Sequence, residues 1–290
     1  MRSPERLGAD AGGETIATAV ESSRRTLAGR SSTPGLDARM LASHVTGLDA
    51  SALIAYGDHR LPPRRLGQLQ TLTARRAAGE PIAYLIGFKE FCGLRIAVDP
   101  RVLIPRPETE ELVQRVIADW RGRRARVLDL GTGSGAIACA LAEGLHEASV
   151  TALDANVDAL AVARQNVEAL GFLDRITLVE SDLFAALGQR RFDAIVANLP
   201  YVADGDPELD AAVARYEPPL ALRAGEDGLA VYRRMFADAP AHLSDGGRVY
   251  CECSPFTAAG VARLAREAFP EADVLVQADM SKRDRIVVVA

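Results

Sequence analysis

The feature that most constrains the fold is a regular alternation of short apolar runs and amphipathic segments from residue 126 to the end of the chain. This order predicts a mostly parallel sheet with helices on both faces. Ligands of such sheets bind at the carboxyl ends of the strands. We expect strands at 126–130, 149–154, 176–180, 194–197, around Val249 and at 285–289, and helices at 135–142, 157–170, 228–241 and 258–268.

The chain before this alternation has a helical pattern of its own. Apolar residues recur at helical spacing over 36–45 and 66–72, and the pair Pro62-Pro63 lies between the two segments. No motif in this part is typical of a nucleophile, a metal site or a phosphate-binding loop. We therefore predict an N-terminal helical domain at 1–78 that either recognises the substrate or only covers the remainder of the protein.

A different pattern connects this domain to the alternating part. The short apolar runs 83–87 and 94–98 are separated by turn residues, which predicts a β-hairpin within a linker at 79–106. Pro107 suits the first turn of a helix, and the carboxylates that follow it favour the positive end of the helix dipole. The alternating domain is therefore expected to span 107–290.

Composition excludes several classes of protein. The chain has 290 residues, of which 48% are hydrophobic, yet no run approaches the roughly 18 consecutive apolar residues that cross a membrane. The N-terminal residues lack the apolar centre of a signal peptide, so we expect a cytoplasmic protein. A net charge of −5 argues against a long nucleic acid as a stable partner. The four cysteines are too few and too scattered to predict a disulfide framework or a metal site.

The first strand of the alternation leads into a glycine-rich turn. Glycines remove Cβ atoms, so backbone N–H groups at the start of the following helix can approach a ligand. The spacing also fits the dinucleotide pattern G-x-G-x-x-A. The turn alone predicts a nucleotide site without identifying the nucleotide, and a purely structural turn is the alternative. From the strand end onward it reads Asp129-Leu130-Gly131-Thr132-Gly133-Ser134-Gly135.

Residues at the ends of the next two strands, together with Asp129, indicate which nucleotide binds. The second strand ends at Asp154, whose carboxylate can accept hydrogen bonds from both hydroxyls of an adenosine ribose. Asp129 is placed to reach a cationic amino group, while Asp182 and Leu183, after the third strand, are placed to meet the edge and face of an adenine. An amino-acid tail and an adenine at these places describe S-adenosylmethionine. A helix N-cap is the alternative role of Asp182.

The fourth strand ends directly in the tetrad Asn198-Leu199-Pro200-Tyr201, at the expected crevice. An amide or an aromatic exocyclic nitrogen is a poor nucleophile because its lone pair is delocalised, so acceptors for its hydrogens are needed to orient it. We expect the Asn198 side-chain oxygen and the Leu199 backbone carbonyl to be these acceptors, and we expect Asn198 to contact the cofactor as well. Pro200 would fix the turn, and Tyr201 would pack over the planar group. Such catalysis depends on orientation and electrostatics without a strong base; an ordinary Asn-x-Pro turn is the alternative.

Several motifs outside these sites, together with the tetrad, resemble the HemK/PrmC family, whose members methylate the glutamine of the Gly-Gly-Gln motif in peptide chain release factors. The resemblance implies a Rossmann-like class I S-adenosylmethionine-dependent methyltransferase domain with a mostly parallel seven-stranded sheet, and a small N-terminal helical domain. It also implies methyl transfer to the glutamine N5, with release factors as partners. The motifs are Leu36-Asp37-Ala38-Arg39, Gly79-Glu80-Pro81-Ile82-Ala83-Tyr84, Leu103-Ile104-Pro105-Arg106-Pro107-Glu108-Thr109, Tyr216-Glu217-Pro218 and Gly225-Glu226-Asp227-Gly228-Leu229.

The tetrad departs from the family at one position. The family normally carries Asn-Pro-Pro-Tyr, whereas this chain has Leu199. The chemistry asks only for a backbone carbonyl there, which leucine supplies with some loss of rigidity. Asn-Leu-Pro-Tyr also resembles ribosomal RNA adenine dimethyltransferases, and a related family methylates a glutamine of a ribosomal protein. Adenine N6 methylation and ribosomal-protein methylation therefore stay as alternatives.

The segment before the first helix of the alternating domain has two possible roles. Arg106, Glu108 and Thr109 either line the crevice and help to bind the substrate, or cap the helix and pair with each other. Two other classes of protein also stay open, an NAD-dependent oxidoreductase and a nonenzymatic nucleotide-binding module. Binding of S-adenosylmethionine in preference to NAD, followed by methyl transfer, would exclude both.

Overall fold

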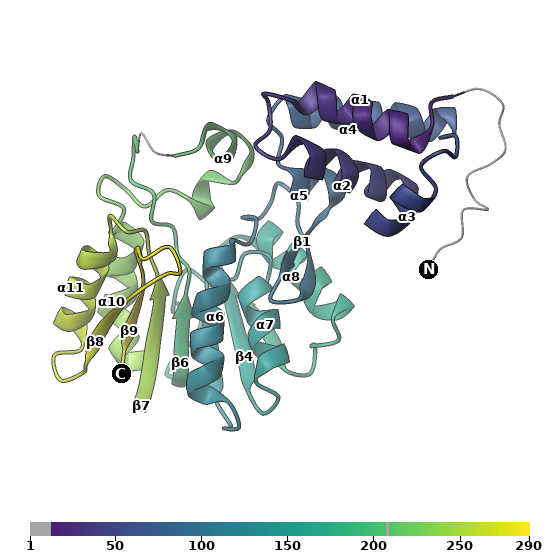
Figure 1. Ribbon diagram of the computed structural model, residues 1–290. Helices are drawn as coiled ribbons and strands as arrows, with labels where there is room; N and C mark the ends of the chain where they lie inside the picture. The colour runs from purple at the N-terminus through teal and green to yellow at the C-terminus, as the bar shows by residue number, and fades with distance from the viewer. Residues whose placement is uncertain (1–12, 207–208) are drawn as a thin grey trace. The chain divides into compact units, whose positions relative to one another are not determined.

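The computed structural model of the chain describes residues 13–206 and 209–290. The N-terminal residues in which we expected no signal peptide lie largely outside this range. The chain divides into two compact units, one that ends at Gly87 and one from Phe88 to Ala290 (Figure 1). Within the described residues, no helix combines the length and the apolar character that a membrane span requires.

The first unit consists of the helices α1 (Ile16–Leu27), α2 (Pro34–Thr46), α3 (Ala50–Ala55), α4 (Pro63–Ala77) and α5 (Ile82–Ile86). Helix α1 begins where the Thr15 hydroxyl accepts a hydrogen bond from the N–H of Thr18, as is typical of an N-cap. Leu41 of α2 is completely buried. Asp37 of α2 and Arg76 of α4 form a largely buried ion pair at 2.6 Å. The predicted helical character of this part is confirmed.

The segment after these helices differs from the expectation. Residues 83–87 were expected to be extended, but they form most of α5 and its C-cap. Because Ala83 to Ile86 are all buried, the run is apolar on every side, and such a run does not distinguish a helical turn from a strand. The helix ends at Gly87, whose φ of +82° suits glycine. The hairpin follows as β1 (Phe88–Phe91) and β2 (Leu94–Ala97), so the boundary between the units falls inside the expected linker.

The second unit is a Rossmann-like α/β domain. Its strands are β3 (Arg126–Leu130), β4 (Ser149–Asp154), β5 (Ile176–Glu180), β6 (Phe192–Ala197), β7 (Leu243–Glu252), β8 (Val274–Ala278) and β9 (Asp284–Val289). Its helices are α6 (Pro107–Trp120), α7 (Ala136–Gly144), α8 (Val157–Ala169), α9 (Ala211–Tyr216), α10 (Ala230–His242) and α11 (Ala258–Ala268), with a 3-10 turn at Pro219–Ala221.

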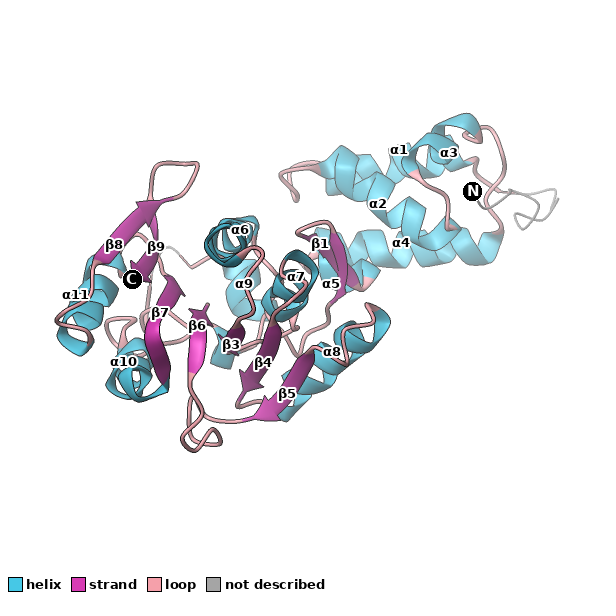
Figure 2. Ribbon diagram, turned by 90° about the horizontal axis from the view of Figure 1, so that it is seen from below, coloured by secondary structure: helices cyan, strands magenta, loops and turns pink. Residues whose placement is uncertain are grey.

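These strands form one sheet in the described residues, in the order β5-β4-β3-β6-β7-β9-β8, and β9 alone runs opposite to the other six strands. Helices α6, α7 and α8 pack on one face, and α10 and α11 on the other (Figure 2). The mostly parallel sheet covered on both faces is therefore confirmed, as is the seven-stranded sheet that the family resemblance implied.

Two elements were not expected from the sequence pattern. Helix α9 has no buried residue, so it lacks the apolar periodicity that predicts a helix. Strand β8 lies at the edge of the sheet, and its residues are exposed or half-buried without alternation. The spacing of apolar residues therefore predicts neither element.

The topology brings the predicted functional residues to one edge of the sheet. Leu130 at the end of β3 pairs with Leu153 of β4 on one side and with Ala197 of β6 on the other. Strand β4 in turn pairs in parallel with β5 through Asp154 and Glu180. Since the chain leaves β3 first toward one side and later returns on the other, the crevice for a ligand opens between β3 and β6.

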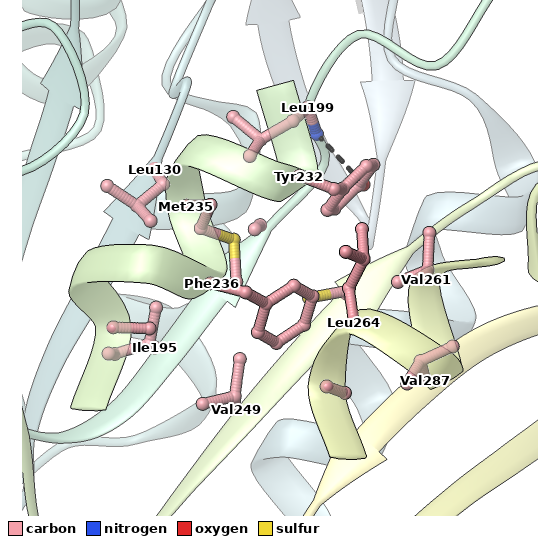
Figure 3. Packing of buried hydrophobic residues seen from close by; sticks show 14 of the residues in the cluster. Leu130, Ile195, Leu199, Tyr232, Met235, Phe236, Val249, Val261, Leu264 and Val287 are labelled. Carbon is pink, nitrogen blue, oxygen red and sulfur yellow. Dashed lines mark hydrogen bonds between the residues drawn. The ribbon is translucent and has the colours of Figure 1, made fainter. Parts of the chain in front are cut away.

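The face covered by α10 and α11 contains a continuous apolar cluster. Figure 3 shows Phe236 of α10 beside residues of the sheet, among them Ile195 of β6. Cys251 and Cys253 of β7 belong to this cluster and are fully buried. Because side chains alternate along a strand, Glu252 between them points to the opposite face, the one covered by α6.

A buried polar side chain joins the hairpin to the sheet domain. Asn166 of α8 accepts a hydrogen bond from the N–H of Ala97 at 2.7 Å and donates to the carbonyls of Ala97 and Ser134. Asn166→Ala should lower the free energy of unfolding by about 2 kcal/mol, because backbone groups lose their partners. Urea denaturation measures the change. Gln165→Ala, at an exposed position of the same helix, should stay within about 0.5 kcal/mol of wild type, and an equal loss in both variants would contradict this role.

Candidate active site

The glycine-rich turn between β3 and α7 has a left-handed backbone at Gly131 and Gly133, with φ of +72° and +54°, which glycine adopts without strain. A Cβ on Gly131 would lie 3.1 Å from the side chain of Leu199, whereas nothing lies within 4 Å of a Cβ on Gly133. The turn therefore contacts the tetrad at its first glycine and leaves open space at its second. Gly135 lies against Ala163 of α8 and shapes the start of α7.

Asp129 lies beneath this turn and is fully buried. The Thr132 hydroxyl donates to its Oδ2 at 2.6 Å, while its Oδ1 has no hydrogen-bond partner within the part of the chain that the structure describes. Burial raises the pKa of Asp129 to about 7, while the Thr132 hydroxyl and the backbone N–H of Ala138 lower it in part. An unpartnered buried carboxylate oxygen suits a cationic group placed near it. The contact of Asp129 with an amino group stays a prediction, which this free oxygen supports.

Three cavities meet at the carboxyl edge of the sheet, and the largest has a volume of about 320 Å³. Its wall includes Gly131, Gly133 and Asp154. The Asp154 carboxylate accepts hydrogen bonds from the N–H groups of Gly133 and Asn156, each at 2.9 Å. Burial raises the pKa of Asp154, although these backbone contacts lower it in part. Asp154 thus joins the ends of β3 and β4 at the place where we expect a ribose.

The turn after β5 carries backbone strain at the wall of the same cavity. Leu183 has a φ of +50°, which is unfavourable for a residue with a side chain, and such strain is typical of functional sites. Ser181 holds this turn, since its hydroxyl donates to the carbonyl of Leu183 at 2.7 Å. Asp182 also lines the cavity and pairs with Arg234 at 2.7 Å. No helix begins at Asp182 in the described residues, so the N-cap alternative is wrong.

Asn198 lies at the wall of all three cavities. The large cavity includes Leu199 and Pro200, and a second cavity of about 170 Å³ includes Arg106 and Tyr201. The third, of about 50 Å³, includes Thr132, Ser134 and Thr109. The Nδ2 group of Asn198 donates to Oγ1 of Thr109 at 3.1 Å. The amide oxygen of Asn198 is therefore the atom left to accept a hydrogen bond from a bound molecule.

Leu199 turns its side chain into the apolar cluster, where it is 4% exposed. Its N–H donates to the hydroxyl of Tyr232 at 3.4 Å (Figure 3), and this hydroxyl in turn donates to the backbone carbonyl of Glu252. A proline at this position would have no N–H to donate. Leucine thus adds a hydrogen bond that proline could not make, and this bond offsets part of the rigidity that the turn loses without proline.

Tyr201 meets a buried carboxylate that sequence reasoning did not identify. Its hydroxyl lies 3.4 Å from Oε1 of Glu252. Burial raises the pKa of Glu252 to about 7, while the Thr109 hydroxyl lowers it. The sequence did contain a signal, because a carboxylate inside an apolar strand requires a compensating environment.

The segment before α6 is held to the segment that follows the tetrad by an ion pair and a hydrogen bond. Arg106 pairs with Glu217 at 2.5 Å, and the second oxygen of this carboxylate accepts the N–H of Ile104 at 3.1 Å. Glu217 is 3% exposed, and the sequence motif that contains it does not by itself indicate this role. The side chains of Arg106 and Thr109 thus contact other segments rather than each other. Glu108 is half-buried in the first turn of α6 and lines none of the three cavities.

Two family models match the chain. A model described as the PrmC N-terminal domain matches residues 18–87. A model described as the methyltransferase small domain matches residues 108–215. The first match ends where the helical unit ends, and the second includes the glycine-rich turn, Asp154 and the tetrad.

Curated relatives cover most of the chain. The release factor glutamine methyltransferase of Bordetella pertussis is 45% identical over 237 residues, which are 81% of this chain and 87% of that protein. The protein of the same name from Escherichia coli is 39% identical over 222 residues, 77% of this chain and 80% of its own length. Among solved structures, a methyltransferase from Pyrococcus furiosus is similar in fold, with a TM-score of 0.50, 20% identity, and 68% of this chain and 88% of that chain covered. The chain belongs to the HemK/PrmC family of release factor glutamine methyltransferases.

Proposed function

We propose that the chain transfers a methyl group from S-adenosylmethionine to the side-chain amide nitrogen N5 of the glutamine in the Gly-Gly-Gln motif of peptide chain release factors. The observation that carries the proposal is the Asn198 carboxamide, which lines three adjoining cavities and directs its NH2 group to Thr109. Its oxygen is thereby free to accept a hydrogen bond from a planar NH2 group. The relatives named release factor glutamine methyltransferase support this choice of substrate.

The large cavity has groups that fit the parts of the methyl donor. Asp154 offers a carboxylate to the ribose hydroxyls, Leu183 offers an apolar side chain to the adenine, and Asp182 offers an acceptor to its edge. Asp129 lines none of the three cavities, but its unpartnered oxygen lies beneath the glycine-rich turn and fits the amino group of the amino-acid tail. When bound, S-adenosylmethionine supplies an electrophilic methyl group on a sulfonium.

The residues around the tetrad act on the acceptor by orienting it. The Asn198 oxygen and the Leu199 backbone carbonyl accept hydrogen bonds from the two N–H groups of the acceptor amide, so the nitrogen lone pair faces the methyl group. Tyr201 lines the second cavity, where the planar amide is expected to pack. Burial raises the pKa of Tyr201, so it stays protonated and does not act as a base. After methyl transfer, one N–H proton of the substrate passes to water.

Adenine N6 is the second candidate acceptor, because Leu199 gives the tetrad its Asn-Leu-Pro-Tyr form. The leucine side chain is 4% exposed and packs in the apolar cluster, so the backbone carbonyl is the polar group that residue 199 offers to the acceptor, as it would be with proline. The identity of residue 199 therefore does not favour adenine over glutamine. The net charge of −5 disfavours a ribosomal RNA substrate, since phosphate neutralisation needs a basic surface.

Incubation with methyl-labelled S-adenosylmethionine tests the proposal. Purified release factor, ribosomal proteins and ribosomal RNA are offered in separate reactions, and the modified site is mapped by mass spectrometry. We expect label on the glutamine of the Gly-Gly-Gln motif, and none on a matched release factor with alanine at that glutamine. Label on ribosomal RNA or a ribosomal protein, with none on the release factor, would refute the proposed substrate.

A further inference from the structure

A buried carboxylate lies behind Asn198 and has no part in the methyl transfer described so far. Glu252, the last residue of β7, is 1% exposed. Its Oε2 has no hydrogen-bond partner within residues 13–206 and 209–290. Burial of an unpartnered carboxylate oxygen is costly, so its presence in a folded protein calls for an explanation.

Thr109 lies between Glu252 and Asn198. Its Oγ1 accepts a hydrogen bond from Nδ2 of Asn198 at 3.1 Å. Helix α6, to which Thr109 belongs, packs against β7 on the face to which Glu252 points, and both side chains are buried there. Burial raises the pKa of Glu252, and the Thr109 hydroxyl is the first of the groups that lower it. A threonine hydroxyl has one hydrogen to donate. If that hydrogen points to an ionised Glu252, the oxygen can only accept, and the amide of Asn198 must present its NH2 group to it.

We propose that Glu252 is a positioning residue, which acts through Thr109 to fix the Asn198 carboxamide with its oxygen toward the acceptor amide. The inference rests on the proposed methyl transfer to a planar NH2 group. A protonated Glu252 can instead donate to Thr109, which can then donate to the oxygen of Asn198. The carboxamide would then turn its NH2 group toward the NH2 group of the substrate, and two donors would face each other.

The charged groups around Glu252 come from several elements. Arg285 of β9 stabilises its ionised form, and Glu108 of α6 opposes it. Tyr201 brings its hydroxyl to Oε1, and Arg285 also pairs with Asp279 at 3.3 Å. Burial outweighs the favourable contacts and raises the pKa of Glu252 to about 7. The ionised form that holds Asn198 productively therefore increases as pH rises through about 7, and kcat should rise with it.

Variants of Thr109 test whether Glu252 acts on Asn198 through the Thr109 hydroxyl, and they do not change the charge of the site. Thr109→Val removes the hydroxyl at similar volume and should lower kcat about 10- to 100-fold, because a small misorientation at the reacting group has such an effect. The Kd for S-adenosylmethionine should stay within about twofold. Thr109→Ser keeps the hydroxyl and should retain at least about a third of the wild-type kcat. Thr73→Val, at a buried threonine of α4, is the matched control and should leave kcat unchanged.

A serine variant as impaired as the valine variant would overturn the inference, and so would a valine variant with wild-type kcat. These outcomes are distinct from failure of the proposed function. A wild-type protein that methylates no release factor refutes the function. If the wild-type protein methylates the release factor and Thr109→Val has the same kcat, only the proposed role of Glu252 and Thr109 is refuted.

Glu252→Gln provides a readout that a merely structural role would not change. In the wild type, kcat should rise as pH passes through about 7. In Glu252→Gln, kcat should be lower at alkaline pH and should show no rise in this range, while the Kd for S-adenosylmethionine is unaltered. A rise of the same size in both proteins would overturn the inference. If this variant does not fold, by circular dichroism, the comparison of Thr109→Ser with Thr109→Val decides the question.

Discussion

Asn198→Ala is expected to lower kcat for methyl transfer to a release factor by about 10³-fold, the effect of removing one preorganised group from a reaction centre. The wild-type amide directs its NH2 group to Thr109, which leaves its oxygen for the proposed contact with the acceptor nitrogen. Alanine removes that acceptor, so the nitrogen lone pair is no longer held toward the methyl group. Single-turnover transfer of label from S-adenosylmethionine measures the chemical step directly.

Cofactor binding is the control for this variant. The groups proposed to hold the methyl donor lie at the ends of other strands, so isothermal titration should give a Kd for S-adenosylmethionine within about threefold of wild type. If Asn198→Ala loses cofactor affinity as strongly as it loses kcat, then Asn198 acts on the cofactor and its assignment to the acceptor amide is wrong.

Asp154→Ala should raise the Kd for S-adenosylmethionine by about 10- to 100-fold, because each hydrogen bond to a charged group contributes roughly 1.5–3 kcal/mol. The variant would remove the proposed ribose acceptor and also the partner of the N–H groups of Gly133 and Asn156. Since burial raises the pKa of Asp154, wild-type affinity should fall on acidification at a higher pH than an ordinary aspartate would cause. Titration calorimetry at several pH values measures both effects.

Asp158→Ala is the matched control, because it removes an exposed carboxylate from the first turn of α8, close to Asp154 in sequence. Its Kd should stay within about twofold of wild type. An unchanged affinity in Asp154→Ala would show that the ribose lies elsewhere. An equal loss in both variants would show that general negative charge, and not the position of Asp154, is responsible.

The sheet was predictable from the sequence wherever a strand is buried on both faces. The interior strands β3, β4 and β6 are apolar runs with few exposed side chains, and such runs stand out from the amphipathic helices between them. Strand β8 and helix α9 lack this contrast because they lie at the surface. The helix α5 was mistaken for a strand because its short run is buried all round. The pattern of apolar residues thus shows which side chains are buried, and it indicates secondary structure only where a helix or strand buries one side.

For the candidate site, the location of the residues could be predicted from the sequence, but their contacts with distant segments could not. The glycine-rich turn, Asp154 and the tetrad follow strand ends directly, so their location at one edge could be predicted from chain order alone. The partners of these residues could not, because they are separated from them along the chain. Thr109 reaches Asn198 across 89 residues and Arg106 reaches Glu217 across 111 residues, and only the folded topology brings such pairs together.

The bond from the Leu199 N–H to the Tyr232 hydroxyl makes the evolution of two positions interdependent. In a homologue with proline at position 199, this donor is absent, and the tyrosine hydroxyl keeps only the carbonyl of Glu252 as a partner. Selection to keep that hydroxyl is then weaker, and drift to phenylalanine at position 232 becomes accessible. With leucine at position 199, the same change to phenylalanine would leave the backbone N–H of residue 199 without its partner. Leucine at position 199 therefore favours tyrosine at position 232, whereas proline is compatible with tyrosine or phenylalanine there.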